Sequence, residues 1–164
     1  MRLFIAIQLS EVVREAIGRA QDALYEKGFR RRYTPWENLH LTLAFIGEYH
    51  DPERVLEVMG NIPFEPFELT LQGLGAFGDL WWIGLKPSQQ LQSYVRRLRH
   101  GLAEAGIPFD RKRFAPHITI LRGAKGTSLK PEAPVQNEPC MIATHASLMR
   151  ADRGKSGMIY TEIL

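Results

Sequence analysis

The sequence contains one short phrase twice, and this repeat limits how the chain can fold. NLHLTLAFIG and APHITILRGA each contain His-x-Thr followed by an apolar residue. Side chains alternate between the two faces of a β-strand, so His40 and Thr42 would share one face of their strand. His117 and Thr119 would do the same in a second strand, with the apolar residues of both strands turned towards a core. The repeat therefore predicts two strands that each present a histidine and a threonine to polar surroundings.

The spacing of apolar residues predicts a chain that mixes helices and strands. Alternating apolar runs predict strands at residues 2–9, 39–46, 67–74, 80–85 and 117–121, with a turn at 75–78. Apolar residues at helical spacing predict helices that begin at Ser10, Asp51 and Ser88 and end near Gly28, Gly60 and Gly106. The remaining stretches are predicted as a basic loop at 29–38, a linker at 63–66, a loop at 123–139, and a hairpin of 141–149 and 158–163 around a turn at 152–157. This order suggests two α+β halves, related by duplication, whose sheets meet.

Length and composition favour a soluble globular protein with a single domain over residues 1–164, built from two intertwined lobes. Of its 164 residues, 45% are hydrophobic and 24% are charged. No run approaches the roughly 18 continuous apolar residues of a membrane span, so we expect no membrane partner. The opening MRLFIAIQLS is predicted as a strand and not as a signal peptide. The single cysteine, Cys140, permits no intrachain disulfide and suggests a cytoplasmic protein.

Two imidazoles and two hydroxyls around one site suit acid–base chemistry on a phosphate. An unperturbed imidazole titrates near pH ~6.5, so one histidine of a pair can be neutral while the other is protonated. Each such general base or acid contributes about 10²–10⁴ in rate. Hydroxyls and an arginine can hold the non-bridging oxygens of a phosphate, and Arg122 would reach them if its strand bends or its side chain swings. These residues predict a phosphoester site that needs no metal.

Other roles for these histidines and for Cys140 fit the sequence less well than a phosphoester site. A lone histidine beside a threonine is more often structural, and it is the second copy that favours a site. Zinc usually takes three or four protein ligands, and neither phrase contains a carboxylate, HExxH or CxxC in a ligand pattern. His50, His100 and His145 are scattered and are interpreted as structural or exposed. Cys140 stands beside a proline without an evident base, so we do not predict a nucleophilic role for it. Since the ligand patterns are missing, we predict neither a metal nor a cofactor.

Basic residues gather just before each phrase. The chain has 21 Lys and Arg against 18 Asp and Glu, a net charge of +3. One cluster is Arg30–Arg32 and the other is Arg111–Arg113, and either alone is equally well interpreted as a solvated loop. Their shared position upstream of a His-x-Thr favours an anionic ligand. The cluster at 30–32 and the loop at 125–130 are candidates for contacts to flanking phosphates.

The quoted phrases resemble a known family. Three stretches are similar to the two-histidine phosphoesterase superfamily: HLTLAFIGE from His40, RFAPHITILR up to Arg122 and the opening RLFIAI. Within it they resemble the LigT-like RNA 2′,3′-cyclic phosphodiesterases, also known as the 2′-5′ RNA ligase family. The resemblance covers nearly the whole chain. It implies a bilobal α+β fold of two pseudo-symmetric halves, whose antiparallel sheets line a central cleft.

The resemblance also implies an activity. Members of the family hydrolyse RNA 2′,3′-cyclic phosphate ends to 2′-phosphomonoesters, and some join tRNA halves through a 2′–5′ linkage. By this resemblance His117 is the proton acceptor that activates water, and His40 is the proton donor to the departing 3′ oxygen. Thr42, Thr119 and Arg122 would hold the phosphate. The partner would be RNA with such an end, tRNA halves included, and the protein would be a monomer.

Contacts beyond the reacting phosphate are less constrained by the sequence. An aromatic side chain could stack on the terminal base, as in many readers of single-stranded RNA. The candidates for base or RNA contacts are Tyr33, Trp36, Phe4, Phe114 and Arg32, and no role is assigned to Trp81 or Trp82. Two alternatives stay open. One is a phosphodiesterase of the same superfamily for a 2′–5′ oligonucleotide or ADP-ribose 1″,2″-cyclic phosphate, and the other is an RNA-binding module without catalysis.

Overall fold

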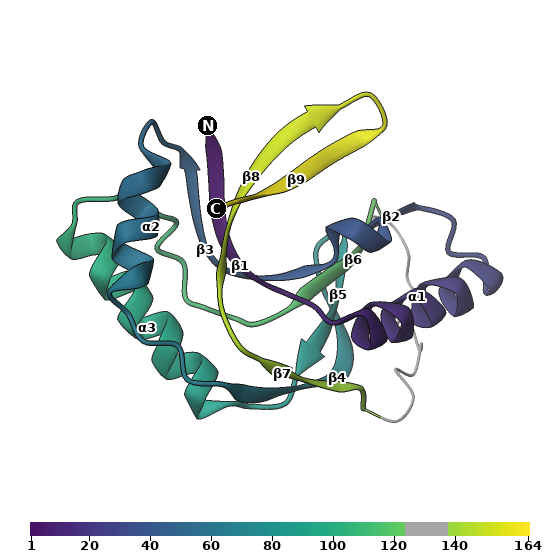
Figure 1. The fold of residues 1–164 in the computed structure, drawn as a ribbon. Coiled ribbons are helices and arrows are strands. Elements are labelled where there is room, and N and C mark those ends of the chain that lie inside the picture. The colour runs from purple at the N-terminus through teal and green to yellow at the C-terminus, as the bar shows by residue number, and fades with distance from the viewer. Residues whose placement is uncertain (124–137) are drawn as a thin grey trace.

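A computed structural model describes residues 1–123 and 138–164. These residues form nine strands, three α-helices and one 3₁₀ turn. In chain order the elements are β1 (Arg2–Gln8), α1 (Glu11–Glu26), β2 (Arg32–Tyr33), the 3₁₀ turn η1 (Trp36–Asn38), β3 (His40–Glu48), α2 (Pro52–Gly60), β4 (Phe67–Phe77), β5 (Leu80–Leu85), α3 (Gln89–Glu104), β6 (Ile118–Arg122), β7 (Cys140–Ala143), β8 (Ser147–Gly154) and β9 (Gly157–Ile163) (Figure 1).

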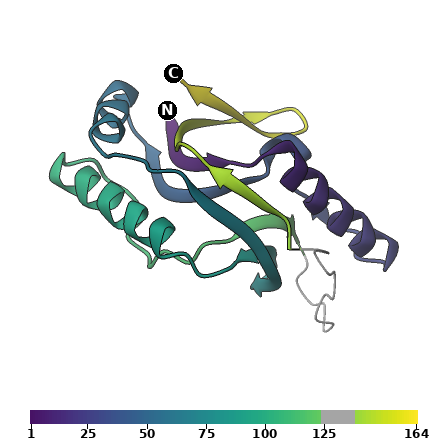
Figure 2. The same cartoon turned by 60° about the horizontal axis from the view of Figure 1, so that its bottom comes forward.

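The strands form two antiparallel sheets, and each sheet contains one of the two motif strands. The first sheet has the order β3-β1-β8-β9 and the second has the order β2-β6-β5-β4-β7. In both views α2 and α3 lie together on one side of the sheets, while α1 lies on the opposite side (Figure 1 and Figure 2). The predicted α+β class with two antiparallel sheets is therefore confirmed. No helix in the described part of the chain is long and apolar enough to cross a membrane.

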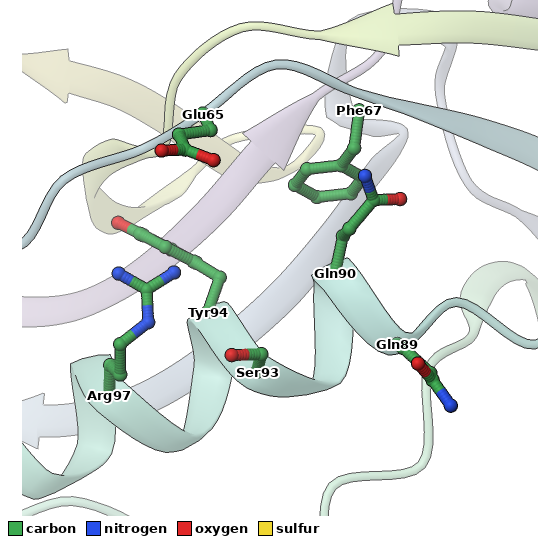
Figure 3. Close-up of a pocket in the computed structure, with 7 residues that line it drawn as sticks. All are labelled: Glu65, Phe67, Gln89, Gln90, Ser93, Tyr94 and Arg97. Carbon is green, nitrogen blue, oxygen red and sulfur yellow. The ribbon is translucent and has the colours of Figure 1, made fainter.

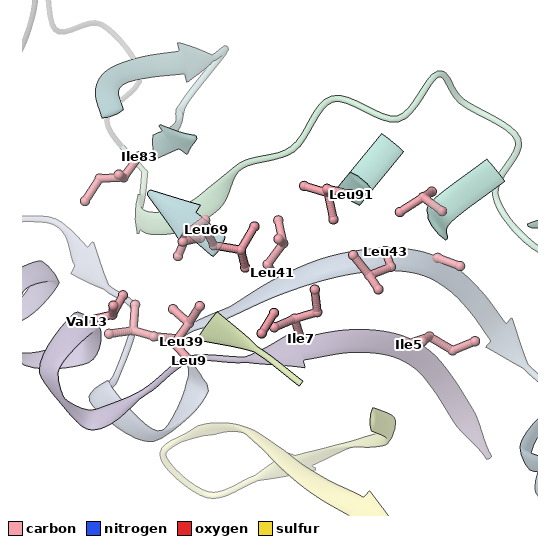
Figure 4. Packing of buried hydrophobic residues seen from close by; sticks show 14 of the residues in the cluster. Ile5, Ile7, Leu9, Val13, Leu39, Leu41, Leu43, Leu69, Ile83 and Leu91 are labelled. Carbon is pink, nitrogen blue, oxygen red and sulfur yellow. The ribbon is translucent and has the colours of Figure 1, made fainter. Parts of the chain in front are cut away.

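The apolar faces of the two sheets pack into one shared hydrophobic cluster. Leu39, Leu41 and Leu43 of the β3 region are fully buried (Figure 4). Ile118 and Ile120 of β6 join the same cluster. Burying one such side chain stabilises the fold by about 1.5–3 kcal/mol, so the alternation of the motif strands is strongly enforced. The histidine and threonine of each motif therefore remain on the opposite face, half-buried, as the alternation predicted.

The three predicted helices are present, with the expected capping residues. The side chains of Ser10, Asp51 and Ser88 each accept a hydrogen bond of 3.2 Å from the backbone N–H three residues further on. Such N-caps typically stabilise a helix by about 1 kcal/mol. Gly28 and Gly106 follow the ends of α1 and α3 with φ of 97° and 73°, a conformation that glycine adopts without steric cost.

Two predicted irregular stretches are ordered strands or turns instead. The basic loop at 29–38 contains β2, because Arg32 and Tyr33 pair with the end of β6, and also η1. The turn predicted at 75–78 is shorter, because pairing with β5 continues as far as Phe77 opposite Leu80. Pairing with the distant β6 in the first place, and with the hairpin partner β5 in the second, overrides the local turn signal of glycine, proline and charge.

The predicted strand at 141–149 is wrong, because two strands in different sheets divide it. β7 pairs with β4 in the second sheet, whereas β8 pairs with β1 in the first. β8 then forms a hairpin with β9, and the turn is confined to Lys155 and Ser156 because pairing extends to Gly154 opposite Gly157. Most of the loop predicted at 123–139 lies outside the described residues.

Candidate active site

An extra residue in β6 brings Arg122 to the same face as Thr119. The register with β5 shifts there, so that Ile120 has no partner on the neighbouring strand. Without this bulge, simple alternation from Ile118 would turn Arg122 towards the core. With it, Leu121 is fully buried and Arg122 is exposed. The bulge thus bends β6 and turns Arg122 away from the core, towards the face that carries Thr119.

β3 carries a bulge at the matching position of its own motif. Thr42 lies opposite Ala6 and Ala44 lies opposite Ile5, which leaves Leu43 as the extra residue. Leu43 and Ala44 are both fully buried, just as the two residues after Thr119 are. The shared bulge supports the interpretation of the two phrases as a structural repeat.

Hydrogen bonds fix the orientation of the His40 ring. Its Nδ1 lies 2.7 Å from the carbonyl oxygen of Asn38 and its Nε2 lies 2.8 Å from Oγ1 of Thr42. A carbonyl can only accept, so Nδ1 carries a proton, and in the neutral ring Nε2 accepts the hydroxyl proton of Thr42. Asn38 is itself buried and its side chain donates to the carbonyl of Met158 at 2.9 Å. The backbone group that orients His40 is therefore anchored to β9.

His117 is oriented by the same device. Its Nδ1 donates to the carbonyl oxygen of Ala115, two residues earlier, at 2.7 Å. Within residues 1–123 and 138–164 its Nε2 makes no hydrogen bond. Both histidines thus keep Nδ1–H on their own backbone, while Nε2 is bonded to the Thr42 hydroxyl in His40 and has no such bond in His117.

Each histidine ring also contacts two aromatic side chains. The His40 ring centroid lies 4.9 Å from that of Phe4 and 5.3 Å from that of Tyr160. The His117 ring lies 5.2 Å from Phe77, which is 49% exposed, and 6.2 Å from Trp82. Three of these four residues, Phe77, Trp82 and Tyr160, were not identified from the sequence. Trp82 is identified only from the register of β5 with β6, in which it lies opposite Thr119.

Trp82 lies flat against two glycines of the β4–β5 hairpin. A Cβ atom at Gly75 would stand 2.3 Å from Cζ2 of the indole, and one at Gly84 would stand 3.1 Å from Cζ3. The indole Nε1 is buried, and it alone among the buried side-chain N and O atoms of the described residues has no hydrogen-bond partner. The glycines therefore give this large ring its place beside His117.

The surroundings of His40 lower its pKa below the ordinary value of 6.5. Burial has the largest effect, and the hydrogen bond to Asn38 opposes it. Electrostatic repulsion from Arg14, from Arg122 and from His117 when it is protonated lowers the pKa further. The free site therefore favours neutral His40, and the charges that act on its ring include those of His117 and Arg122 from the second motif.

Arg14 supports His40 from α1 and was also missed in the sequence analysis. Arg14 is a buried residue, and its guanidinium donates from Nε to the carbonyl of Leu9 and from Nη1 to the carbonyl of Trp36, both at 2.9 Å. It also lies over the Trp36 ring, 5.0 Å from the centroid. Arg14 therefore ties α1 to the 3₁₀ turn that supplies the carbonyl partner of His40.

The remaining candidates from the sequence have different environments. Phe4 is only 4% exposed and packs on His40, and Tyr33 packs on the core with its hydroxyl donating to the carbonyl of Phe29. Trp36 is 46% exposed, and Arg32 is exposed directly opposite Arg122. Phe114 is half-buried beneath the guanidinium of Arg99. Of the aromatic candidates, only Trp36 is exposed, and Arg14 covers one face of its ring.

A separate surface pocket contains none of the motif residues. It lies between α3 and the chain leading into β4, and its lining residues are Glu65, Phe67, Gln89, Gln90, Ser93, Tyr94 and Arg97 (Figure 3). Burial raises the pKa of Tyr94 to about 12, so this phenol stays protonated near neutral pH. Across the described ranges, no group of three or more His, Cys, Asp or Glu side chains is placed to hold a metal ion.

The fold and the site together define a class: an α+β protein whose two antiparallel sheets each present a histidine and a threonine from matching strand positions. The sequence over residues 9–155 matches the family described as the 2′-5′ RNA ligase superfamily. The chain belongs to this superfamily, which confirms the family predicted from the two phrases.

Known relatives and solved structures agree with this assignment. The chain is 33% identical to an RNA 2′,3′-cyclic phosphodiesterase of Thermotoga maritima, over 74% of this chain and 70% of the relative. It is 38% identical to a protein of the same name from Escherichia coli K12, over 75% and 72% of the two chains. The crystal structure of E. coli LigT in the apo form superposes with a TM-score of 0.87 at 29% identity, covering 99% of this chain and 94% of that one.

Proposed function

We propose that the chain hydrolyses RNA 2′,3′-cyclic phosphate ends to 2′-phosphomonoesters, with His40 and His117 as an acid–base pair. Its relatives are named RNA 2′,3′-cyclic phosphodiesterase, and the chain is accordingly an enzyme, a phosphodiesterase of the hydrolase class. One observation carries the proposed mechanism. Both histidines donate Nδ1–H to the carbonyl two residues earlier, so that each turns Nε2 away from its own backbone, where Thr42 contacts that of His40.

Water attacks the phosphorus while the bond to the 3′ oxygen breaks. Neutral His117 accepts a proton from the attacking water at Nε2, and the water oxygen forms the new bond to phosphorus. The electron pair of the broken bond stays on the 3′ oxygen, which takes the proton from Nε2 of His40. Arg122 and Thr119 hold the non-bridging oxygens, where negative charge grows in the transition state. Proton exchange with solvent then restores both rings.

Substrate binding and protonation of His40 are coupled through Thr42. In the free site the Thr42 hydroxyl proton is donated to neutral His40. When His40 is protonated, Nε2 becomes a donor and the Thr42 hydroxyl is free to donate to a phosphate oxygen. An anionic phosphate also favours the charged imidazolium directly. The cyclic phosphate thus promotes the protonation state that its own cleavage requires.

The same groups account for a 2′–5′ ligation. If a 5′-hydroxyl of a second RNA replaces water, His117 accepts its proton and the attack forms a 2′–5′ phosphodiester. The bond to the 3′ oxygen breaks as before, and His40 protonates that oxygen. RNA with a cyclic phosphate end, tRNA halves among them, is the partner that we propose.

The test uses purified protein in EDTA with a 2′,3′-cyclic mononucleotide and a short RNA that carries the same end. Chromatography against 2′- and 3′-phosphate standards identifies the product. We expect the 2′-phosphate. A 3′-phosphate would overturn the assignment of the leaving oxygen. Absence of turnover with both substrates, together with turnover of ADP-ribose 1″,2″-cyclic phosphate, would favour another nucleotide substrate.

A further inference from the structure

We propose that Arg32, held beside Arg122, binds the phosphate on the 5′ side of the terminal nucleotide and so makes the site prefer RNA ends over free cyclic nucleotides. This inference rests on the proposed function and names its substrate more closely. A cyclic mononucleotide has a single phosphate group. An RNA end presents the reacting cyclic phosphate and, one nucleotide further in, a second anionic phosphate.

The two arginines form a like-charged pair across two strands. Arg32 of β2 lies directly opposite Arg122 of β6. Directly opposed like charges destabilise an antiparallel pair, so this arrangement has a cost unless an anion is bound. Neither guanidinium has an ion pair or a hydrogen bond with any residue of 1–123 or 138–164. The pair is therefore an anion site for which the described chain supplies no carboxylate.

Several contacts fix Arg32 in this place. β2 is only two residues long, and the next residue, Thr34, donates its backbone N–H to the carbonyl of Ile120 at 3.0 Å. The side-chain amide of Gln21 donates to the carbonyls of both Thr34 and Ile120, each at 3.0 Å. Tyr33 packs on the core. A segment this short would not form a strand alone, so these contacts to the β6 bulge hold the backbone of Arg32 opposite Arg122, while its side chain stays exposed.

The position of Arg32 distinguishes its task from that of Arg122. Arg122 is close enough to His40 for its charge to act on that ring. Arg32 lies one strand further out, on the edge of the sheet. The guanidinium of Arg32 lies beside Gly123, because its Nε is 3.8 Å from the position that a Cβ atom on Gly123 would occupy. Arg122 thus suits the reacting phosphate, and Arg32 suits the next phosphate along the strand.

The test compares kcat/KM for a 2′,3′-cyclic mononucleotide and for a pentaribonucleotide with the same end, in the wild type and in Arg32→Gln. We expect Arg32→Gln to lower the value for the pentamer about fivefold, as loss of one exposed charge contact would, and to leave the mononucleotide unchanged. The slope of log(kcat/KM) against log[salt] for the pentamer should flatten by about 0.7, the value for one phosphate of a single strand. Arg96→Gln, an exposed arginine of α3, is the matched control and should change neither value.

An equal loss for both substrates would overturn the inference, because Arg32 would then act on the reacting phosphate. No loss for either substrate would overturn it as well. Binding of the pentamer with a 2′-phosphate end is measured in parallel by fluorescence anisotropy. Lack of turnover by the wild type would count against the proposed function, whereas equal binding of this RNA by wild type and Arg32→Gln would count against the subsite.

Discussion

Replacing Arg14 by methionine should reveal how α1 controls the histidine that donates the proton. Arg14→Met keeps most of the apolar stem but removes the charge and both hydrogen bonds of the guanidinium. The carbonyls of Leu9 and Trp36 lose their donors. The 3₁₀ turn that orients His40 is then held by fewer contacts.

The size of the effect follows from the surroundings of the two carbonyls. A hydrogen bond from a charged donor contributes about 1.5–3 kcal/mol net. Leu9 is buried, so its carbonyl would be left without a partner, whereas the Trp36 carbonyl still accepts from the backbone N–H of Leu39 at 3.4 Å and belongs to an exposed residue that water can reach. Removing a buried charge also offsets part of the loss. We therefore expect the free energy of unfolding to fall by about 2–4 kcal/mol, measured by urea denaturation at pH 7.5.

The same substitution should raise the pKa of His40, because the charge of Arg14 lowers it. NMR titration of the imidazole Cε1–H signals measures this directly. The alkaline limb of the pH profile of kcat/KM should move upward with it, since His40 must be protonated in the free enzyme to act as the acid. Arg14→Lys retains the charge and serves as the control. A His40 pKa that is unchanged or lower in Arg14→Met would refute the reasoning.

Three further perturbations test other parts of the site. Thr42→Val keeps the shape but removes the hydroxyl, so kcat/KM should fall about 10²–10³-fold with little change in the circular dichroism spectrum, and retained activity would exclude the hydroxyl from the mechanism. Gly75→Ala would place a Cβ 2.3 Å from the Trp82 indole, so the free energy of unfolding should drop by about 1–3 kcal/mol and tryptophan fluorescence should shift. An unaltered fluorescence spectrum and urea midpoint would contradict this packing. Because the folded-state pKa of His40 is lowered, the unfolded chain binds more protons between about pH 6.5 and that lowered pKa, and the free energy of unfolding should decrease as pH falls through this window. His40→Gln should lack this component of the pH dependence, and an identical dependence in both proteins would show that another group causes it.

The faces of the motif strands could be predicted from the sequence because strand alternation is local. Leu39 and Leu41 had to lie opposite His40 and Thr42 once a strand was assumed, and the shared core enforces that choice. The N-caps were also local, since serine or aspartate side chains reach only the next turn of the helix.

What the sequence could not predict depends on pairing between distant strands. The face of Arg122 depends on the bulge at Ile120, and a bulge is visible only in the register with β5. The place of Trp82 beside Thr119 depends on the same register. Residues 141–149 are divided between two sheets, and the chain passes from β7 to β8 at residues 144–146. These residues include no glycine or proline that would predict a break between strands.

The central claim is that His40 and His117 act together as acid and base, and their alanine variants test it most directly. Hydrolysis of a 2′,3′-cyclic mononucleotide in EDTA is measured for the wild type, His40→Ala and His117→Ala, with circular dichroism to verify that each is folded. The account predicts a 2′-phosphate product from the wild type and a loss of turnover of at least about 10²-fold in either folded variant. Turnover near the wild-type rate in either folded variant would contradict the two-histidine mechanism.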